Sequence, residues 1–193
     1  MTANKVVTFA EGDTAKKVTG ETLAIDSHAH VYPEKYLDLL EHAGRDPQTT
    51  KIARGMGADS SDEDMTERLN WMDRVGVEIQ VLAVTPQVPA NMDSAEWIND
   101  EYARLIARYP GRFAAYGALP LPNIDAALEE LPRVYDRGFL GISVPTVFYD
   151  GTTLDCDEFD PLWSALDERK AVVNIHPTGY GACSPLIAGK GLE

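Results

Sequence analysis

The sequence predicts an α/β fold in which parallel strands alternate with helices and curl into a barrel. Five short runs of β-branched or small residues alternate with helical patterns of about ten residues or more, the order typical of strand–helix–strand units around a parallel sheet. The first and last runs carry polar side chains on one face only. Such a face is typical of a barrel lumen, while the branched side chains opposite pack against the helices.

The five predicted strands alternate regularly enough for their faces to be assigned. In chain order they are Leu23–Asp26, Ile79–Thr85, Phe113–Ala118, Leu140–Val144 and Ala171–Ile175. Continued through the first strand, the alternation gives one face consisting of Ala24, Asp26, His28 and His30. In the last strand the equivalent face consists of Val172, Asn174 and His176. We expect both faces to line the lumen.

The predicted helices have recognisable starts and ends. They are Glu34–Ala43, Glu63–Val75, a segment capped by Asp93 that ends at Tyr109-Pro110-Gly111, Ile124–Asp136 capped by Asn123, and a segment from Asp160 to Lys170. Ser60-Ser61-Asp62-Glu63 has capping-box form, and Asp160-Pro161 is a cap residue followed by proline. The polar stretch Arg45–Asp64 is either a solvated connection or an active-site lid.

Three histidines form the main chemical signal of the sequence. His28 and His30 are two positions apart on the first strand, so their Cβ atoms lie roughly 6.6 Å apart and their rings can share one ion. His176 ends the last strand, directly before Pro177. Because the carboxyl ends of parallel barrel strands form one face, the three side chains are expected to meet there and bind a metal ion.

The bulk properties exclude several classes of partner. The net charge is −14, from 31 acidic and 17 basic residues, and this charge repels nucleic acid and anionic lipid surfaces. The sequence shows neither the apolar core of a signal peptide nor a run long enough to span a membrane. We therefore expect a cytoplasmic protein.

A series of motifs resembles the amidohydrolase-related group of enzymes. The motifs are Asp26-Ser27-His28-Ala29-His30, the run from Arg68 to Val77, Asn99-Asp100-Glu101, Tyr109-Pro110-Gly111-Arg112-Phe113 with Leu119-Pro120, and Phe159-Asp160-Pro161-Leu162-Trp163 leading to His176-Pro177. They are most similar to the branch that contains aminocarboxymuconate semialdehyde decarboxylase and γ-resorcylate decarboxylase. The resemblance extends from about residue 23 to the end of the chain.

The resemblance implies a (β/α)8 TIM-type barrel that binds one divalent ion, zinc in most members and manganese in some. His28, His30 and His176 match the family's metal ligands. The implied reaction is non-oxidative decarboxylation of a small carboxylated ring or ring-derived acid. The alternative is hydrolysis of a lactone or amide at the same metal.

The resemblance also suggests roles for residues around the histidines. Asp26 is either a fourth ligand or a partner that orients a histidine N–H. Arg54 is either a substrate-carboxylate ligand or an exposed loop arginine, and a guanidinium can bind a carboxylate through two parallel hydrogen bonds. Thr85 and Thr146, at strand ends, are expected to shape the substrate pocket.

The chain departs from the family after His176. Members of the group have three further strands, with a histidine used in proton transfer and a metal-binding aspartate. The residues after Pro177, TGYGACSPLIAGKGLE, contain neither. We therefore expect an N-terminal extension, 1–22, followed by the N-terminal part of a barrel, 23–193, with about five of the eight strand–helix units. An open half-barrel of this kind is expected to aggregate, to pair with itself as a homo-oligomer, or to be missing its other part. An inactive truncated barrel fragment is the further alternative for its function.

Overall fold

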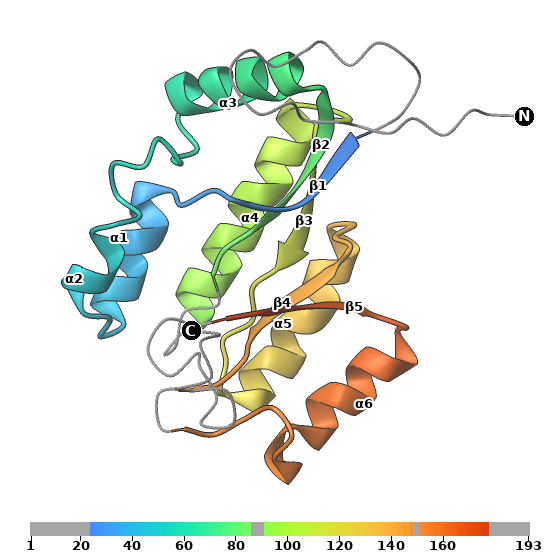
Figure 1. The fold of residues 1–193 in the computed structure, drawn as a ribbon. Coiled ribbons are helices and arrows are strands. Elements are labelled where there is room, and N and C mark those ends of the chain that lie inside the picture. The colour runs from blue at the N-terminus through green and yellow to red at the C-terminus, as the bar shows by residue number, and fades with distance from the viewer. Residues whose placement is uncertain (1–23, 86–90, 149–150, 178–193) are drawn as a thin grey trace, which may run out of the picture.

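The structure is a computed structural model in which residues 24–85, 91–148 and 151–177 are described. The predicted N-terminal extension, 1–22, lies outside these residues. Five parallel strands form one sheet in the order β1-β2-β3-β4-β5. They are β1 (Ala24–His30), β2 (Val77–Ala83), β3 (Phe113–Gly117), β4 (Gly141–Pro145) and β5 (Val172–His176). The sequential order and the helical crossovers make this sheet half of a (β/α)8 barrel, which confirms the predicted fold class (Figure 1).

Helices connect successive strands and cover one face of the sheet (Figure 1). They are α1 (Glu34–His42), α2 (Pro47–Thr50), α3 (Asp62–Val75), α4 (Met92–Arg108), α5 (Ile124–Asp136) and α6 (Asp160–Glu168), with a 3-10 turn, η1 (Asp157–Phe159), before α6. None of the helices in the described part of the chain is both long and apolar enough to cross a membrane.

Side-chain caps and glycines set most helix ends. The Asn123 side chain accepts a hydrogen bond from the Ala126 N–H and caps its helix as predicted. The cap of α3 is Ser61, which accepts a hydrogen bond from the Asp64 N–H, and not Ser60 of the predicted capping box. Gly76 ends α3 at φ 78°, a left-handed conformation that costs little without a Cβ.

Three further local predictions differ from the structure. Asn91, rather than Asp93, caps α4 in a reciprocal pair with Ser94, which starts the helix earlier. Asp160 is the first residue of α6 and not its cap, because η1 runs directly into the helix. The stretch Arg45–Asp64 contains the short helix α2.

The apolar core lies between the sheet and the helices. Its fully buried members include Leu40 of α1, Met65 and Met72 of α3, Leu105 of α4 and Ile142 of β4. Gly141 permits the close approach of β4 and β5, since a Cβ at this position would lie 1.9 Å from the Val172 carbonyl oxygen. The opposite face of the sheet is the one that would line the lumen of a closed barrel.

Candidate metal centre

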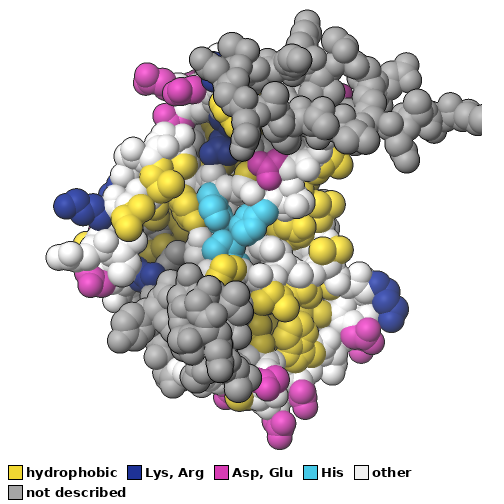
Figure 2. Space-filling view, viewed as in Figure 1, with side chains coloured by type: hydrophobic (Ala, Val, Ile, Leu, Met, Phe, Trp, Pro, Cys, Tyr) yellow, Lys and Arg dark blue, Asp and Glu magenta, His cyan; other side chains and the backbone are white. Residues whose placement is uncertain are grey.

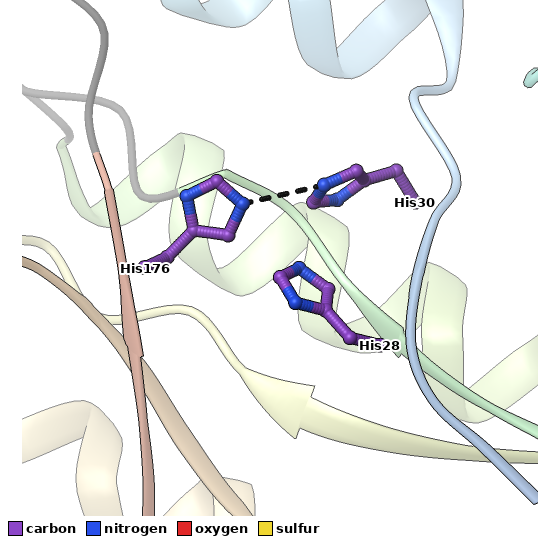
Figure 3. A group of neighbouring side chains, drawn as sticks. All are labelled: His28, His30 and His176. Atoms are coloured by element: carbon purple, nitrogen blue, oxygen red, sulfur yellow. Dashed lines mark hydrogen bonds between the residues drawn. The ribbon is translucent and has the colours of Figure 1, made fainter. Parts of the chain in front are cut away.

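Three histidines from β1 and β5 meet at the carboxyl ends of the strands. Figure 2 shows histidine side chains grouped in a hollow of the molecular surface, and Figure 3 shows the rings of His28, His30 and His176 pointing toward one another. One nitrogen from each ring lies within 4.8 Å of the other two. The ring centroids are 4.7 to 5.2 Å apart. The curvature of the sheet thus joins residues that are 146 positions apart in the chain.

A bulge in β1 turns His28 and His30 toward this hollow. Asp26 pairs with Gln80 of β2, but the next pair joins Ala29 to Leu82, so β1 has one residue more than β2 between the two pairs. Because Gln80 and Leu82 lie on one face of β2, Asp26 and Ala29 both face the helix layer. His28 and His30, on either side of Ala29, therefore point to the opposite face of the sheet, toward the hollow.

Carbonyl groups fix the proton positions of two rings. His30 Nδ1 lies 2.9 Å from the Ala83 carbonyl oxygen, and His176 Nδ1 lies 2.5 Å from that of Pro177. A carbonyl only accepts hydrogen bonds, so each neutral ring has its proton on Nδ1 and a free lone pair on Nε2. These two Nε2 atoms face each other at 3.3 Å (Figure 3). Two lone pairs at this distance repel each other unless a cation or a proton lies between them.

The spacing of the two nitrogens fits one small metal ion. Nitrogens bound at about 2.0–2.1 Å to a tetrahedral ion are about 3.4 Å apart, close to the separation of His30 Nε2 and His176 Nε2. Burial lowers the pKa of His30, and it also lowers the pKa of His176. Neutral imidazole is the form that binds metals, so both shifts favour metal binding near neutral pH.

Tyr32 and Thr85 form one wall beside His30. The Tyr32 ring stacks on the His30 ring, with centroids 5.1 Å apart and an interplanar angle of 23°. Its hydroxyl lies 2.5 Å from Thr85 Oγ1. The predicted pocket residue Thr85 is thus linked to the cluster through Tyr32, which the sequence reading did not identify as a site residue.

Asp26 lies outside the cluster, because the bulge reverses the predicted face. Strict alternation predicts Asp26 on the same face as the histidines, but the alternation does not hold across the extra residue in β1. Its carboxylate accepts hydrogen bonds from the His28 backbone N–H at 3.2 Å and from Gln80 Nε2 at 2.9 Å. Asp26 therefore contacts the backbone of His28 and no histidine ring.

Arg54 binds the protein's own carboxylates. Its guanidinium forms ion pairs with Glu34, Asp38 and Glu41, all on α1. A substrate carboxylate would have to compete with these three acids. The structure therefore gives no support to a substrate-binding role for Arg54.

Thr146 lies directly beside the third histidine. Its backbone N–H donates to the His176 carbonyl at 3.0 Å. Its hydroxyl Oγ1 is buried and has no hydrogen-bond partner among the described residues. Buried hydroxyls normally have a partner, so this group remains a candidate contact for a bound molecule.

Comparison with known families assigns the chain to one of them. A model described as amidohydrolase matches residues 25–189. The chain belongs to the amidohydrolase family. This result confirms the resemblance found in the sequence motifs, and the histidines of this amidohydrolase chain lie within the matched region.

Curated relatives of this amidohydrolase are named decarboxylases. A 2-amino-3-carboxymuconate-6-semialdehyde decarboxylase of Dictyostelium discoideum is 28% identical over 177 residues, covering 81% of this chain and 49% of the relative. A gamma-resorcylate decarboxylase of Rhizobium radiobacter is 37% identical over 123 residues, covering 57% of this chain and 38% of the relative. The chain thus spans about half or less of the length of these relatives.

A solved decarboxylase structure has a similar fold. The 5-carboxyvanillate decarboxylase of Novosphingobium aromaticivorans, complexed with manganese and 4-hydroxy-3-methoxy-5-nitrobenzoic acid, is 25% identical with a TM-score of 0.66. The match covers 86% of this chain and 54% of that one.

Proposed function

We propose that this amidohydrolase chain forms the metal-binding part of an enzyme that decarboxylates a small carboxylated aromatic or ring-derived acid. The observation that carries the proposal is the meeting of three imidazoles at the carboxyl ends of β1 and β5, with two Nε2 atoms 3.3 Å apart. Such an arrangement suits a divalent cation and has no evident structural purpose without one. The names of the relatives support decarboxylation over hydrolysis.

In this proposal His28, His30 and His176 hold the ion. A divalent ion supplies a positive centre that polarises a bound oxygen and stabilises negative charge as a carboxylate departs. The Ala83 and Pro177 carbonyls keep two of the rings in the ligating tautomer. We assign the unpaired hydroxyl of Thr146 to a polar group of the substrate and the Tyr32–Thr85 pair to the pocket wall.

The family resemblance implies zinc, with manganese as an alternative. Imidazole ligands suit zinc better than manganese, which prefers oxygen ligands, but a relative of similar fold was solved with manganese. We therefore propose a divalent ion, with manganese as the first to test. Its binding is measured by calorimetric titration of metal-stripped protein with Mn²⁺ and, separately, with Zn²⁺.

The decisive variants are His28→Ala and His176→Ala. Loss of one of three ligands is expected to weaken Mn²⁺ binding by at least about a hundredfold, because the remaining histidines cannot complete the site. His42→Ala is the matched control, since His42 is a histidine of α1 outside the cluster. Equal affinity of all four proteins, or no binding by the unaltered chain, would refute the metal site.

Decarboxylation is tested separately from metal binding. A protein that contains this chain together with the remaining strands of the barrel is loaded with manganese and incubated with a panel of hydroxybenzoates, and released CO2 is measured beside a lactone-opening assay. We expect CO2 release that disappears when the metal is removed. Metal binding accompanied by lactone opening alone would reject the decarboxylase assignment while leaving the metal site intact.

A further inference from the structure

A half-buried arginine lies on the far side of the strand that carries the histidine pair. Arg68 extends from α3 to β1 and β2, where Nη1 donates to Gln80 Oε1 at 3.0 Å and Nη2 donates to the His30 carbonyl at 2.7 Å. Gln80 in turn donates from Nε2 to Asp26, whose other oxygen accepts the His28 N–H. This chain of contacts, which we call the Arg68 network, consists of Arg68, Gln80 and Asp26.

The Arg68 network spans the bulge of β1. Asp26 lies just before the extra residue and His30 follows it, so the two ends of the irregular segment are tied to the same guanidinium. A bulge interrupts the ladder of backbone hydrogen bonds that would otherwise set the register of the strand. The network supplies side-chain hydrogen bonds where ladder bonds are missing.

Stability alone does not account for this arginine. Burial lowers the pKa of Arg68, which reflects the cost of removing the charged guanidinium from water. Among the described residues it forms hydrogen bonds with an amide and a carbonyl, while Nε is buried without a partner. Its two hydrogen bonds both hold β1, directly at the His30 carbonyl and through Gln80 at Asp26.

We propose that the Arg68 network is a positioning device for the histidine pair. It fixes the bulged backbone of β1 so that His28 and His30 point toward His176, which lies on the other edge strand, β5. This inference rests on the proposed metal site and deepens it, because Arg68 acts on the ligands through their backbone and touches neither ion nor substrate.

The test measures Mn²⁺ affinity of Arg68→Ala and Gln80→Leu by calorimetry. Residues that orient metal ligands typically change affinity by about tenfold to a hundredfold on mutation, and we expect a loss of that size. Asn99→Ala is the matched control, because Asn99 is also buried and hydrogen-bonded but contacts Ala118 and Glu130 instead of β1. The control is expected to lose stability while its folded form retains Mn²⁺ affinity.

Chemical rescue separates positioning from general folding. Arg68 and Gln80 line an open cavity of about 340 Å³ together with Met56 and Trp71, so free guanidinium can reach the space left by Arg68→Ala. Millimolar guanidinium is expected to restore Mn²⁺ affinity in Arg68→Ala and to change nothing in Gln80→Leu. Arg68→Lys keeps the charge but loses the paired N–H donors of the guanidinium. Its Mn²⁺ affinity is expected to lie between that of the unaltered chain and that of Arg68→Ala.

A nuclear magnetic resonance measurement on the metal-free protein gives a second test, which does not depend on metal binding. The ring ¹⁵N signals of His30 report whether its proton is on Nδ1, as the contact with Ala83 requires. We expect Arg68→Ala and Gln80→Leu to mix the two tautomers. Unchanged tautomers in variants that bind Mn²⁺ as tightly as the unaltered chain would overturn the inference. If the unaltered chain binds no Mn²⁺, the proposed function fails, whereas the ring signals still show whether the network positions His30.

Discussion

At the residue scale, carbonyl and amide groups, which carry no charge, form the hydrogen bonds that hold histidine rings and buried carboxylates in place. Carbonyls of Ala83 and Pro177 set the tautomers of two histidines, and amide groups carry the contacts of Asp26 and Glu130. A buried ionisable group needs such partners because the protein interior solvates charge poorly. The positions of the clustered histidines are therefore set by residues outside the cluster.

Asn99 allows a prediction about stability at this scale. Its amide donates to the Ala118 carbonyl at 3.0 Å and to Glu130 at 2.8 Å, and its oxygen accepts the Ala118 N–H at 2.8 Å. Asn99→Ala leaves several buried groups unpaired, so we expect the free energy of unfolding to fall by at least about 2 kcal/mol. Urea denaturation measures it, with exposed Asn70→Ala as control. A loss below about 0.5 kcal/mol in Asn99→Ala would contradict the prediction.

At the scale of elements, ion pairs attach the stretch after α1 to that helix. Arg54 contacts three acids of α1, and Thr50 donates a hydrogen bond to Glu41 at 2.5 Å. The Tyr32 N–H also donates to the Ala58 carbonyl at 2.7 Å. The stretch Arg45–Asp64 is thus held against α1 and the end of β1, so the simple picture of a solvated connection is incomplete.

The contacts of Glu41 predict a dependence on pH. Hydrogen bonds from Thr50 and Arg54 lower the pKa of Glu41 below its ordinary value of 4.5. A lowered pKa means that the carboxylate stabilises the fold above pH 4.5 and that this contribution disappears as the pH falls through the folded-state pKa. Urea midpoints measured from pH 6 to pH 3 should therefore fall less steeply for Glu41→Gln than for the unaltered chain. Glu129→Gln, an exposed change on α5, should follow the unaltered chain, and parallel curves for all three would refute the role of Glu41.

Sequence patterns predicted the elements well and their irregularities poorly. All five strands and the main helices lie where the periodicity placed them, because burial of one face imposes a period on the sequence. The bulge in β1 left no such sign, since it is defined by register against β2, about fifty residues away. Strict alternation therefore brought the histidines together correctly and placed Asp26 on the wrong face. Gln80, a polar residue within an apolar strand, was the available signal for the Arg68 network.

At the scale of the whole molecule, the candidate site draws its ligands from both edges of one curved sheet. β1 and β5 are the outermost strands, and their histidines meet only because the sheet curls. These edge strands also expose large apolar side chains: Ile25 is 52% exposed, Val172 52% and Ile175 58%. An edge strand with apolar side chains and unpaired backbone groups readily pairs with another strand. The curvature of the sheet thus brings the histidines together, and the two strands that carry them are edge strands able to pair with another strand.

We therefore expect this chain, expressed as given, to self-associate in a concentration-dependent way through β5. Val172→Lys and Ile175→Lys, made together, place charge on that edge and are expected to lower the weight-average mass measured by sedimentation at micromolar concentration. Ile52→Lys is the control, because Ile52 is 76% exposed but lies outside the strands. If the control lowers the mass equally, association depends on net charge and not on the edge. A monomeric unaltered chain would show that the edges are not adhesive, since any strand pairing between copies must raise the mass.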